Sequence, residues 1–572
     1  MKFSQSPLLM QRLPVWRARL VLGLLLAMFA ALIGRSLYLQ GFQNGFLQKK
    51  GESRYERVLD ISATRGRIVD RNGDVLAVST PVKSVWAIPE DARLNPARAR
   101  ELAQLLEMDV RELNRKLASG REFVFVRRQI SPDVAERVAA LELPGIHMQR
   151  EYRRYYPAGE VAAHVLGFTG VEDAGQEGIE LAMNGLLSGK PGSRRVIKDR
   201  RGQIVEDVES IRAPQEGKDI VLALDAKIQY LAYTHLKQAV AANRARAGGI
   251  VVLDARSGEV LALANLPAYN PNDRRRLAGD PLRNRALTDT FEPGSTLKPF
   301  TVALALEKGG VRFDTPIQTA PGKLIIGPAT ISDAHSNGLL TVAQVIQKSS
   351  NVGAAKIALS MPREEMWQMF DSVGFGAPLK LGFPGEAAGR LRPAKTWRPI
   401  EQATMAYGHG ISVTLMQLAR AYQVFARDGD LVPLSLTKLD APPLAGRAVF
   451  SAQTAREIRA MLEMAVQPGG TAPKAQIPGY RVAGKTGTAH KLEGRAYAEK
   501  YVASFVGFAP VSDPRLIVAV MIDEPSAGKY FGGEVAAPVF AQVMGGGLRT
   551  LGVPPDAPMK PLLMAEAAKE AM

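Results

Sequence analysis

The chain has 572 residues, enough for two or three domains, and its 46% hydrophobic and 23% charged residues argue against a disordered or fibrous protein. A formal charge of +17 is compatible with nucleic acid, an anionic membrane or an anionic polymer as a neighbour, but no phosphate loop, zinc knuckle or aromatic-basic RNA motif occurs, so no nucleic acid partner is expected. The absence of cysteine excludes disulfides and thiol catalysis, and six scattered histidines predict no metal site.

An apolar run near the N-terminus predicts a membrane anchor. The run LVLGLLLAMFAALIG, residues 20–34, is shorter than the roughly 20 residues of a usual spanning helix, but flanking residues and snorkelling arginines extend it to 18–38. No clear A-x-A site follows, which favours an uncleaved anchor over a cleaved signal peptide. Basic residues place the tail 1–17 in the cytoplasm. No second run long enough to span occurs, so the remainder is expected on the far side of the membrane.

Residues 39–215 are expected to form a separate, non-catalytic domain. The stretch 65–80 alternates apolar and polar residues around Asn72-Gly73, which predicts a β-hairpin. The apolar spacing over 95–142 predicts helices. Near Ala213-Pro214 the residue pattern of the sequence changes, and we place a domain boundary at about 216.

Residues 216–552 are expected to form an α+β domain. Two strands are predicted around a turn within 248–265, and helical patterns dominate from 296 to 425. Three strands, RVAGKTGTA, YVASFVGFAP and RLIVAVMIDEP, return near the end, followed by a helix over 535–552. This order predicts an antiparallel sheet with helices on its faces. The Pro- and Ala-rich tail, 553–572, is expected to be flexible.

The stretch EPGSTLKPF can be interpreted in two ways. Ser295 follows a Pro-Gly turn and could cap the helix that begins there. A capping box, however, has Glu or Gln three residues after the cap, and this chain has Lys298. A lysine beside the positive end of a helix and away from water has a depressed pKa, so it can act as a base for a serine three residues away. This motif alone leaves both interpretations open.

Two further motifs favour the interpretation of Ser295 as a nucleophile. S-x-x-K occurs three times in the chain, but only Ser295–Lys298 opens a long helix. Ser349 and Asn351 form an S-x-N motif, and AGKTGTA contains a K-T-G motif that begins at Lys485. The three motifs, in this order and within one domain, are the set of the penicillin-binding proteins and class A β-lactamases.

The chain resembles the class B penicillin-binding proteins, and among them the division-type (septal) D,D-transpeptidases of Gram-negative bacteria known as penicillin-binding protein 3. The resemblance extends over nearly the whole chain. It is carried by the stretches RGRIVDRNGDVLA, YYPAGEVAAHVLGFTG, GQEGIE, FEPGSTLKPF, YGHGISVTLMQLA, AGKTGTA and YFGGEVAAPVF. It implies the penicillin-binding serine transpeptidase fold, with an elongated N-terminal pedestal over 39–215 and one transmembrane helix.

The resemblance also implies a mechanism without metal or cofactor. Ser295 would attack the penultimate D-Ala carbonyl of a peptidoglycan stem peptide, and Lys298 would take its proton. Ser349, with Lys485 nearby, would relay a proton to the departing D-Ala, and Asn351 would orient Lys298. The acyl-enzyme would then be attacked by the amine of a second stem peptide, and β-lactam antibiotics would acylate the same serine.

Substrate binding is expected along the K-T-G strand. The expected substrate-binding residues are Thr486, Gly487, Thr488, Tyr530 and Phe531. The threonine hydroxyls would hold the terminal carboxylate, the glycine would leave room for the substrate, and the N–H groups of Ser295 and Thr488 would form an oxyanion hole. The two aromatic residues would form a wall of the site, or only pack at a strand-to-helix junction.

Other functions share parts of this pattern. A β-lactamase would be a single soluble domain, a D,D-carboxypeptidase would transfer the acyl group to water, and an inactive scaffold would only recruit division proteins. YGHGISVT and YFGG favour the transpeptidase. Expected partners are a membrane-embedded glycosyltransferase and other division proteins, at the bacterial inner membrane with a periplasmic catalytic domain. His409 and His490 depart from the septal pattern and hint at a paralogue.

Overall fold

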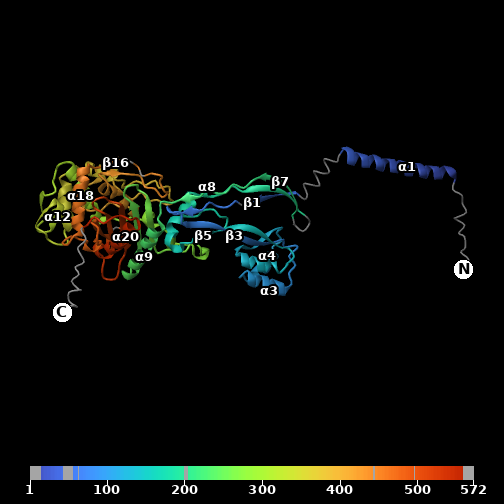
Figure 1. Cartoon of the computed structure of the whole chain (residues 1–572), viewed down its shortest axis with the longest axis horizontal. Helices are drawn as coiled ribbons and strands as arrows, with labels where there is room; N and C mark the ends of the chain where they lie inside the picture. Colours follow the sequence, from blue (N-terminus) through green and yellow to red (C-terminus); the bar gives the residue numbers. More distant parts are fainter. Residues whose placement is uncertain are drawn as a thin grey trace, which may run out of the picture. The chain divides into compact units, whose positions relative to one another are not determined.

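The computed structural model describes residues 14–42, 56–61, 63–198, 204–441, 443, 445–494 and 496–557 (Figure 1). Most of the predicted cytoplasmic tail and most of the predicted C-terminal tail lie outside these residues. By its internal contacts the chain divides into two compact units. The first combines Met1–Ala63 with Gly189–Glu216, and the second combines Thr64–Ser188 with Gly217–Met572.

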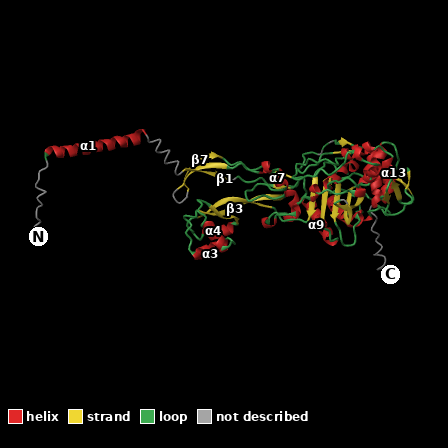
Figure 2. Cartoon of the chain, turned by 180° about the vertical axis from the view of Figure 1, so that it is seen from behind, coloured by secondary structure: helices red, strands yellow, loops and turns green. Residues whose placement is uncertain are grey.

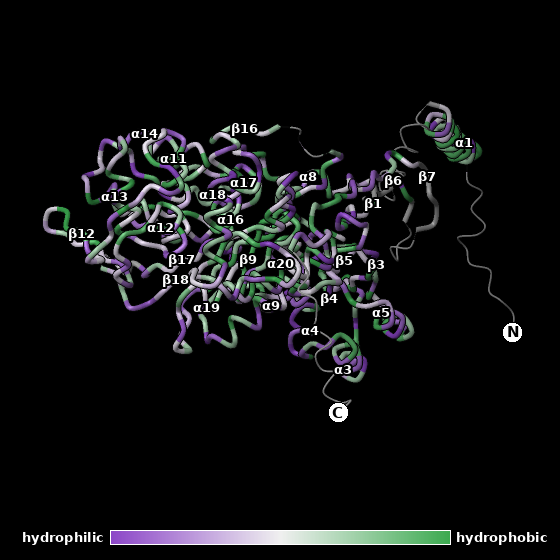
Figure 3. The backbone as a smooth tube through the Cα atoms, turned by 60° about the vertical axis from the view of Figure 1, so that its left-hand side comes forward, coloured by the Kyte–Doolittle hydropathy of each residue, from purple (hydrophilic) through white to green (hydrophobic). Residues whose placement is uncertain are grey.

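Helix α1, Val15–Leu37, contains the predicted membrane segment. Its 23 residues extend about 35 Å at 1.5 Å per residue, which exceeds the roughly 30 Å of a bilayer's hydrocarbon core. None of its residues is buried, and Figure 3 colours the helix hydrophobic over most of its length. A π-helical turn, Tyr38–Phe42, follows it. The helix is therefore long and apolar enough to span a membrane once.

The remainder of the first unit is a three-stranded antiparallel sheet in the order β1-β6-β7. Its strands are β1 (Glu56–Ile61), β6 (Gly192–Lys198) and β7 (Ile204–Arg212). The strand β1 pairs along its whole length with β6, although more than 130 residues separate them in the sequence. This sheet thus joins the segment after α1 to the segment before residue 216.

The N-terminal part of the second unit is a sheet flanked by short helices. The strand order is β4-β3-β2-β8, with β5 also paired to β3. The strands are β2 (Ile68–Val69), β3 (Val75–Ala87), β4 (Val124–Ile130), β5 (Ile146–Tyr155) and β8 (Ile220–Val221). The helices are α3 (Pro96–Leu105), α4 (Val110–Leu117), α5 (Pro132–Ala139), α6 (Ala163–Leu166), α7 (Gly178–Ala182) and α8 (Asn184–Leu187), with the 3₁₀ turn Gly159–Ala162.

The hairpin predicted at Asn72-Gly73 is confirmed, and Gly73 has the positive φ, 95°, that such a turn requires. The prediction of helix throughout 95–142 is wrong at its centre, where β4 lies between α4 and α5. The segment VFVRRQI pairs with β3 because its β-branched and aromatic residues fit a half-buried strand, a preference that the helical spacing on either side obscured.

A buried charge cluster connects three segments that are distant in the sequence. Glu180 is fully buried, and its carboxylate accepts hydrogen bonds of 2.6 Å from the Nε atoms of both Arg65 and Arg154. Arg65 also donates to Asn184 and Ser188. One carboxylate thus pairs with two buried guanidinium groups, which fixes the entry of the chain at residue 65 against the segments 154–156 and 178–188.

A five-stranded antiparallel sheet in the order β10-β9-β19-β18-β17 forms the centre of the C-terminal part (Figure 2). Its strands are β9 (Ala247–Asp254), β10 (Val260–Leu266), β17 (Ala483–Glu493), β18 (Ala496–Ala509) and β19 (Leu516–Asp523). The central strands β9 and β19 are buried throughout because helices cover both faces. On one face lie α9 (Ala226–Ala242) and α20 (Ala537–Thr550), and on the other lies α16 (Leu415–Ala421). The predicted α+β fold is confirmed.

A helical region adjoins the face of the sheet that α16 covers, and it contributes to the hydrophobic core on that face. Its helices are α10 (Arg285–Thr288), α11 (Lys298–Glu307), α12 (Val342–Lys348), α13 (Asn351–Leu359), α14 (Arg363–Ser372), α15 (Pro399–Met405), α17 (Gln423–Ala426) and α18 (Ala452–Val466). Short strand pairs accompany them: β11 (Pro316–Gln318) with β14 (Leu339–Thr341), β12 (Lys323–Ile326) with β13 (Ala329–Ser332), and β15 (Asp430–Leu431) with β16 (Arg447–Ala448). Helix α19 (Gly532–Val535) precedes α20.

We predict that Glu180→Ala lowers the free energy of unfolding by about 3–5 kcal/mol, because it leaves two buried arginines without their counter-charge. Denaturant unfolding of the full chain measures this change. Glu172→Ala is the matched control, since Glu172 pairs with Arg128 at an exposed position, and it should cost no more than about 1 kcal/mol. A Glu180 variant as stable as the control would contradict the prediction.

Candidate active site

Ser295 lies in a tight turn and does not cap a helix. The turn is a 3₁₀ segment, Gly294–Leu297, that continues directly into α11. Gly294 has a φ of 58°, in the left-handed region that favours glycine. The Ser295 hydroxyl makes no capping hydrogen bond and instead accepts one of 2.9 Å from the Nζ of Lys298. Of the two interpretations, helix cap and serine–lysine pair, the structure agrees with the serine–lysine pair.

Lys298 is completely buried, and its amine lies among four oxygen atoms. Besides Ser295 Oγ, its Nζ lies 2.8 Å from Asn351 Oδ1, 3.0 Å from Ser349 Oγ and 2.5 Å from Ser349 O. Burial holds the pKa of Lys298 well below its usual value, and the charge of nearby Lys485 lowers it further. A charged ammonium group could donate only three hydrogen bonds to these four oxygen atoms. A neutral amine, in contrast, can accept a proton from the Ser295 hydroxyl.

Ser349 bridges two lysines. It ends α12 in a left-handed conformation, with φ 59°, that is unfavourable for a residue other than glycine. This conformation directs its hydroxyl between the amines of Lys298, at 3.0 Å, and Lys485, at 2.9 Å. Burial lowers the pKa of Lys485 to about 7. A proton can therefore pass between the two amines through one hydroxyl.

Asp333 holds the S-x-N segment in place, although no sequence motif points to it. Its carboxylate accepts hydrogen bonds from the Ser350 hydroxyl at 2.6 Å and from the backbone N–H groups of Asn351 and Val352 at 2.5 and 2.9 Å. It therefore occupies the N-terminus of α13, where a negative charge is stabilised. Asn351 itself donates to Ser332 O at 2.9 Å, which leaves its side-chain oxygen for Lys298.

The K-T-G residues lie on β17, at the edge of the sheet. A Cβ atom on Gly487 would lie 2.6 Å from Pro293 O and 2.3 Å from Ser504 Oγ, so this glycine lets the turn that carries Ser295 approach the strand. From the sequence, Gly487 was expected only to leave room for the substrate. Gly294 lies against the backbone of Thr488, because an added Cβ would be 3.4 Å from Thr488 N.

The threonines of this strand have fixed positions. Thr486 Oγ1 lies 3.1 Å from the hydroxyl of Thr471 and 3.3 Å from Lys485 Nζ. Thr488 Oγ1 accepts a hydrogen bond from the N–H of Gly532, which ties the loop after β19 to the strand. Thr471 had no sequence signal, since its segment contains no motif.

Tyr530 and Phe531 belong to a larger aromatic cluster. Tyr530 stacks on Tyr501 with 4.1 Å between ring centroids, and its ring lies 4.5 Å from that of Phe531, which is half exposed. Tyr501 contacts His490, its register partner across β17 and β18. Tyr501 was missed, although its position opposite His490 follows from strand pairing. The loop to which Tyr530 and Phe531 belong is held against Thr488.

The side chain of His409 is largely buried. Its ring packs between Tyr407 and Tyr497, and burial lowers its pKa to about 4, with a smaller contribution from the charge of Lys298. It is therefore neutral at physiological pH. His490, in contrast, is exposed.

Comparison with known proteins identifies the family. The model of the penicillin-binding protein transpeptidase domain matches residues 248–545, and that of the penicillin-binding protein dimerisation domain matches residues 60–222. The chain belongs to the penicillin-binding protein transpeptidase family. The resemblance found in the sequence is confirmed.

Several relatives are similar over almost their whole length. The probable peptidoglycan D,D-transpeptidase PenA of Neisseria gonorrhoeae is 46% identical over 95% of this chain and 94% of its own. The peptidoglycan D,D-transpeptidase FtsI of Escherichia coli strain K12 is 43% identical over 95% and 93%. The solved transpeptidase domain of Burkholderia pseudomallei penicillin-binding protein 3 is 53% identical, with a TM-score of 0.55, over 59% of this chain and 98% of that domain.

We predict that Asp333→Ala reduces the rate of serine acylation by about 10- to 100-fold, because the S-x-N segment loses three hydrogen bonds and Lys298 loses its fixed acceptors. Asp333→Asn keeps one side-chain oxygen, the kind of atom that accepts from both N–H groups, and should recover part of the rate. Stopped-flow acylation by a chromogenic β-lactam measures both. An Asp333→Ala variant that acylates at the unaltered rate would show that the carboxylate has no positioning role.

The pKa shifts of the two lysines predict how acylation depends on pH. The reactive form needs a neutral amine at Lys298, whose pKa burial holds well below its ordinary value, and burial lowers the pKa of the neighbouring Lys485 to about 7. The acylation rate should therefore rise between pH 5 and 8 and change little up to pH 9. A profile that rises only above pH 9 would mean that Lys298 keeps an ordinary lysine pKa.

Proposed function

We propose that this protein is a peptidoglycan D,D-transpeptidase that crosslinks stem peptides through an acyl-serine intermediate in septal cell-wall synthesis. The observation that carries the proposal is the buried contact of 2.9 Å between the amine of Lys298 and the hydroxyl of Ser295. Family membership and the names of the relatives, PenA and FtsI, support the reaction type. The FtsI relatives support the septal role.

Acylation begins when Lys298 accepts the proton of Ser295 Oγ, which attacks the carbonyl carbon of the penultimate D-Ala. The N–H groups of Ser295 and Thr488 are proposed to stabilise the oxyanion, each by about 3 kcal/mol. The C–N bond to the terminal D-Ala then breaks. The proton returns to the leaving amine through the Ser349 hydroxyl, which contacts both Lys298 and Lys485.

The second half of the reaction reverses the first. The amine of another stem peptide attacks the ester carbon, its proton passes to Lys298, and Ser295 leaves with its own proton restored. We assign the terminal carboxylate of the donor to the hydroxyls of Thr486 and Thr488, and a wall of the site to Tyr530 and Phe531. A β-lactam enters the same pathway, but its leaving nitrogen stays tethered to the acyl group.

The apolar helix near the N-terminus, the one candidate span within the described residues, and the FtsI relatives support a single-pass membrane protein. We propose that the tail before it is cytoplasmic and that the catalytic part is periplasmic, where peptidoglycan is crosslinked. The proposed division is an anchor at 18–38, a pedestal at 39–215 and a transpeptidase domain at 216–552. A membrane-embedded glycosyltransferase and other division proteins are the proposed partners.

Labelling of the full chain in detergent with a fluorescent penicillin tests the nucleophile. We expect one slowly released adduct, located on Ser295 by mass spectrometry, and none in Ser295→Ala. Ser435→Ala, which removes the serine of a second S-x-x-K motif, is the control and should label normally. An adduct on another residue, or equal labelling of Ser295→Ala, would contradict the proposal.

A thioester donor with an added amino-acid acceptor then separates transpeptidation from hydrolysis. A transpeptidase forms the amide product in an amount that rises with the acceptor concentration. A carboxypeptidase releases the free acid at a rate that the acceptor does not change.

A further inference from the structure

Acylation places a positive charge on a buried side chain. When Lys298 accepts the proton of Ser295, its amine becomes an ammonium group, although the lysine is completely buried. The oxygen atoms that its amine contacts are neutral: two hydroxyls, a backbone carbonyl and the side-chain carbonyl of Asn351. Among the described residues no aspartate or glutamate forms an ion pair with Lys298. The charge that appears during acylation therefore needs another source of stabilisation, because an uncompensated buried charge is unfavourable.

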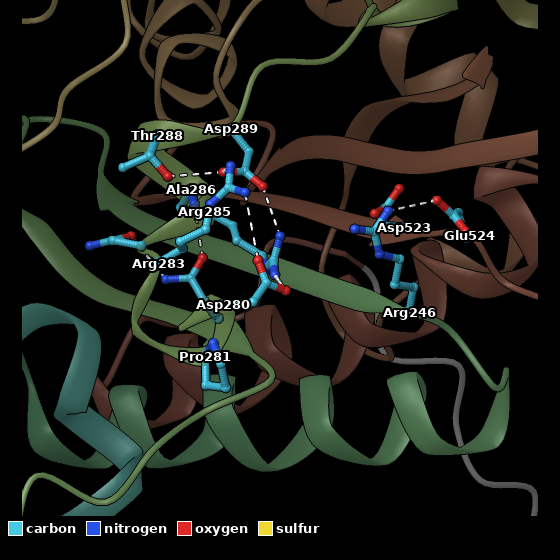
Figure 4. Close-up of polar contacts among 12 residues, drawn as sticks. Arg246, Asp280, Pro281, Arg283, Arg285, Ala286, Thr288, Asp289, Asp523 and Glu524 are labelled. Atoms are coloured by element: carbon cyan, nitrogen blue, oxygen red, sulfur yellow. Dashed lines mark hydrogen bonds and ion pairs between the residues drawn. The ribbon is translucent and has the colours of Figure 1, made fainter. Parts of the chain in front are cut away.

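Buried arginines in the same part of the chain have carboxylates as partners. Arg285 is 4% exposed, and its guanidinium donates to both Asp280 and Asp289 (Figure 4). Asp289 also accepts a hydrogen bond of 2.5 Å from Arg283. These arginines are always charged, so a permanent counter-charge suits them. Lys298 has to alternate between a neutral and a charged form, and a carboxylate in direct contact would favour the charged form throughout.

Tyr407 presents the face of its aromatic ring to this amine. The Nζ atom of Lys298 lies over the ring, 5.9 Å from its centroid. The face of an aromatic ring attracts a cation at distances up to about 6 Å, and the attraction is stronger where water is excluded. Tyr407 is 8% exposed, so little water screens the contact. The ring can thus stabilise an ammonium group less strongly than a carboxylate would, and without keeping it charged between reactions.

The elements around the active site hold this ring in place. Tyr407 belongs to one apolar cluster with Ile331 of β13 and Val352 of α13, the elements that flank the S-x-N segment. The next residue, Gly408, accepts a hydrogen bond of 3.3 Å at its carbonyl from the N–H of Gly294 in the serine turn. The ring therefore has a fixed position relative to both the nucleophile and its base.

We propose that Tyr407 is a positioning residue of the acylation step, whose ring face stabilises the ammonium form of Lys298 that proton transfer from Ser295 creates. In this step the proton moves from Ser295 Oγ to Lys298 Nζ while the bond from Oγ to the carbonyl carbon forms and the carbonyl electron pair moves to its oxygen. The ring exchanges no proton and makes Lys298 a stronger base. The inference rests on the proposed acyl-serine mechanism and adds to it a residue outside the three motifs.

Other charged or titratable groups act on the same amine. The charge of Lys485 on β17 lowers the pKa of Lys298 and that of Asp333 raises it, both less than burial lowers it. His409 contacts the Tyr407 ring, and burial lowers its pKa to about 4, so it is neutral above about pH 5. Burial raises the pKa of Tyr407 to about 12, so the phenol keeps its proton. Substitutions that keep the shape of the ring leave all these groups in place.

Fluorinated phenylalanines at position 407 test the proposal in the full chain in detergent. Tyr407→Phe is the reference, because it retains the ring. Tyr407→3,5-difluorophenylalanine and Tyr407→3,4,5-trifluorophenylalanine keep its approximate shape but remove negative charge density from its face in two steps. Stopped-flow acylation by a chromogenic β-lactam is measured from about pH 5.5 to 8.5. The amount of fluorescent penicillin bound at completion gives the active fraction of each variant.

The effect of fluorination should depend on pH. On the high-pH plateau, where Lys298 is neutral before the reaction, the trifluoro variant should acylate about three- to tenfold more slowly than Tyr407→Phe, with the difluoro variant between them. A less stable ammonium form also leaves more of Lys298 neutral at low pH. On the low-pH limb the difference should therefore vanish or reverse. Loss of packing would instead slow acylation by the same factor at every pH.

The same fluorinated residues in place of Phe375 are the matched control. Phe375 is buried in the neighbouring core, where its ring packs edge-on against Phe300 with 5.7 Å between centroids. Fluorination there should leave the pH profile unchanged. Equal rates for all substituents at position 407, or slowing by one factor at every pH, would overturn the role of the ring. No penicillin adduct in the unsubstituted chain would instead overturn the acyl-serine mechanism itself.

Discussion

The burial of Lys298 is the constraint on which the rest of the active site depends. A fully buried amine loses its proton because no solvent stabilises the charge, and a second buried lysine nearby strengthens the effect. The same amine in water would be protonated at neutral pH and could not accept a proton from serine. Every element that closes the site around this residue therefore contributes to catalysis without touching the substrate.

Closure of the site requires close approach of backbone segments. Gly487 lets the serine-bearing turn pack on β17. Gly408 approaches Gly294 so closely that a Cβ atom added to Gly408 would lie 2.2 Å from the carbonyl oxygen of Gly294. Asp333 fixes the start of α13, and the strained Ser349 directs its hydroxyl between two amines. These features reduce conformational freedom or introduce backbone strain. Burial of the large hydrophobic core beneath them offsets this unfavourable free energy.

The fold was largely predictable because its signals are local. Period-two alternation, Asn72-Gly73 and the buried runs of β9 and β19 each follow from a few adjacent residues. The helical interpretation across β4 failed because a short strand lay between two helical patterns. The motif residues were found, and the structure brings Ser295, Lys298, Ser349, Asn351 and Lys485 together. Asp333 and Thr471 were missed because they contact residues 17 and 15 positions away, which leaves no pattern in one sequence. Tyr501 was missed because its position opposite His490 follows only once β17 and β18 are paired.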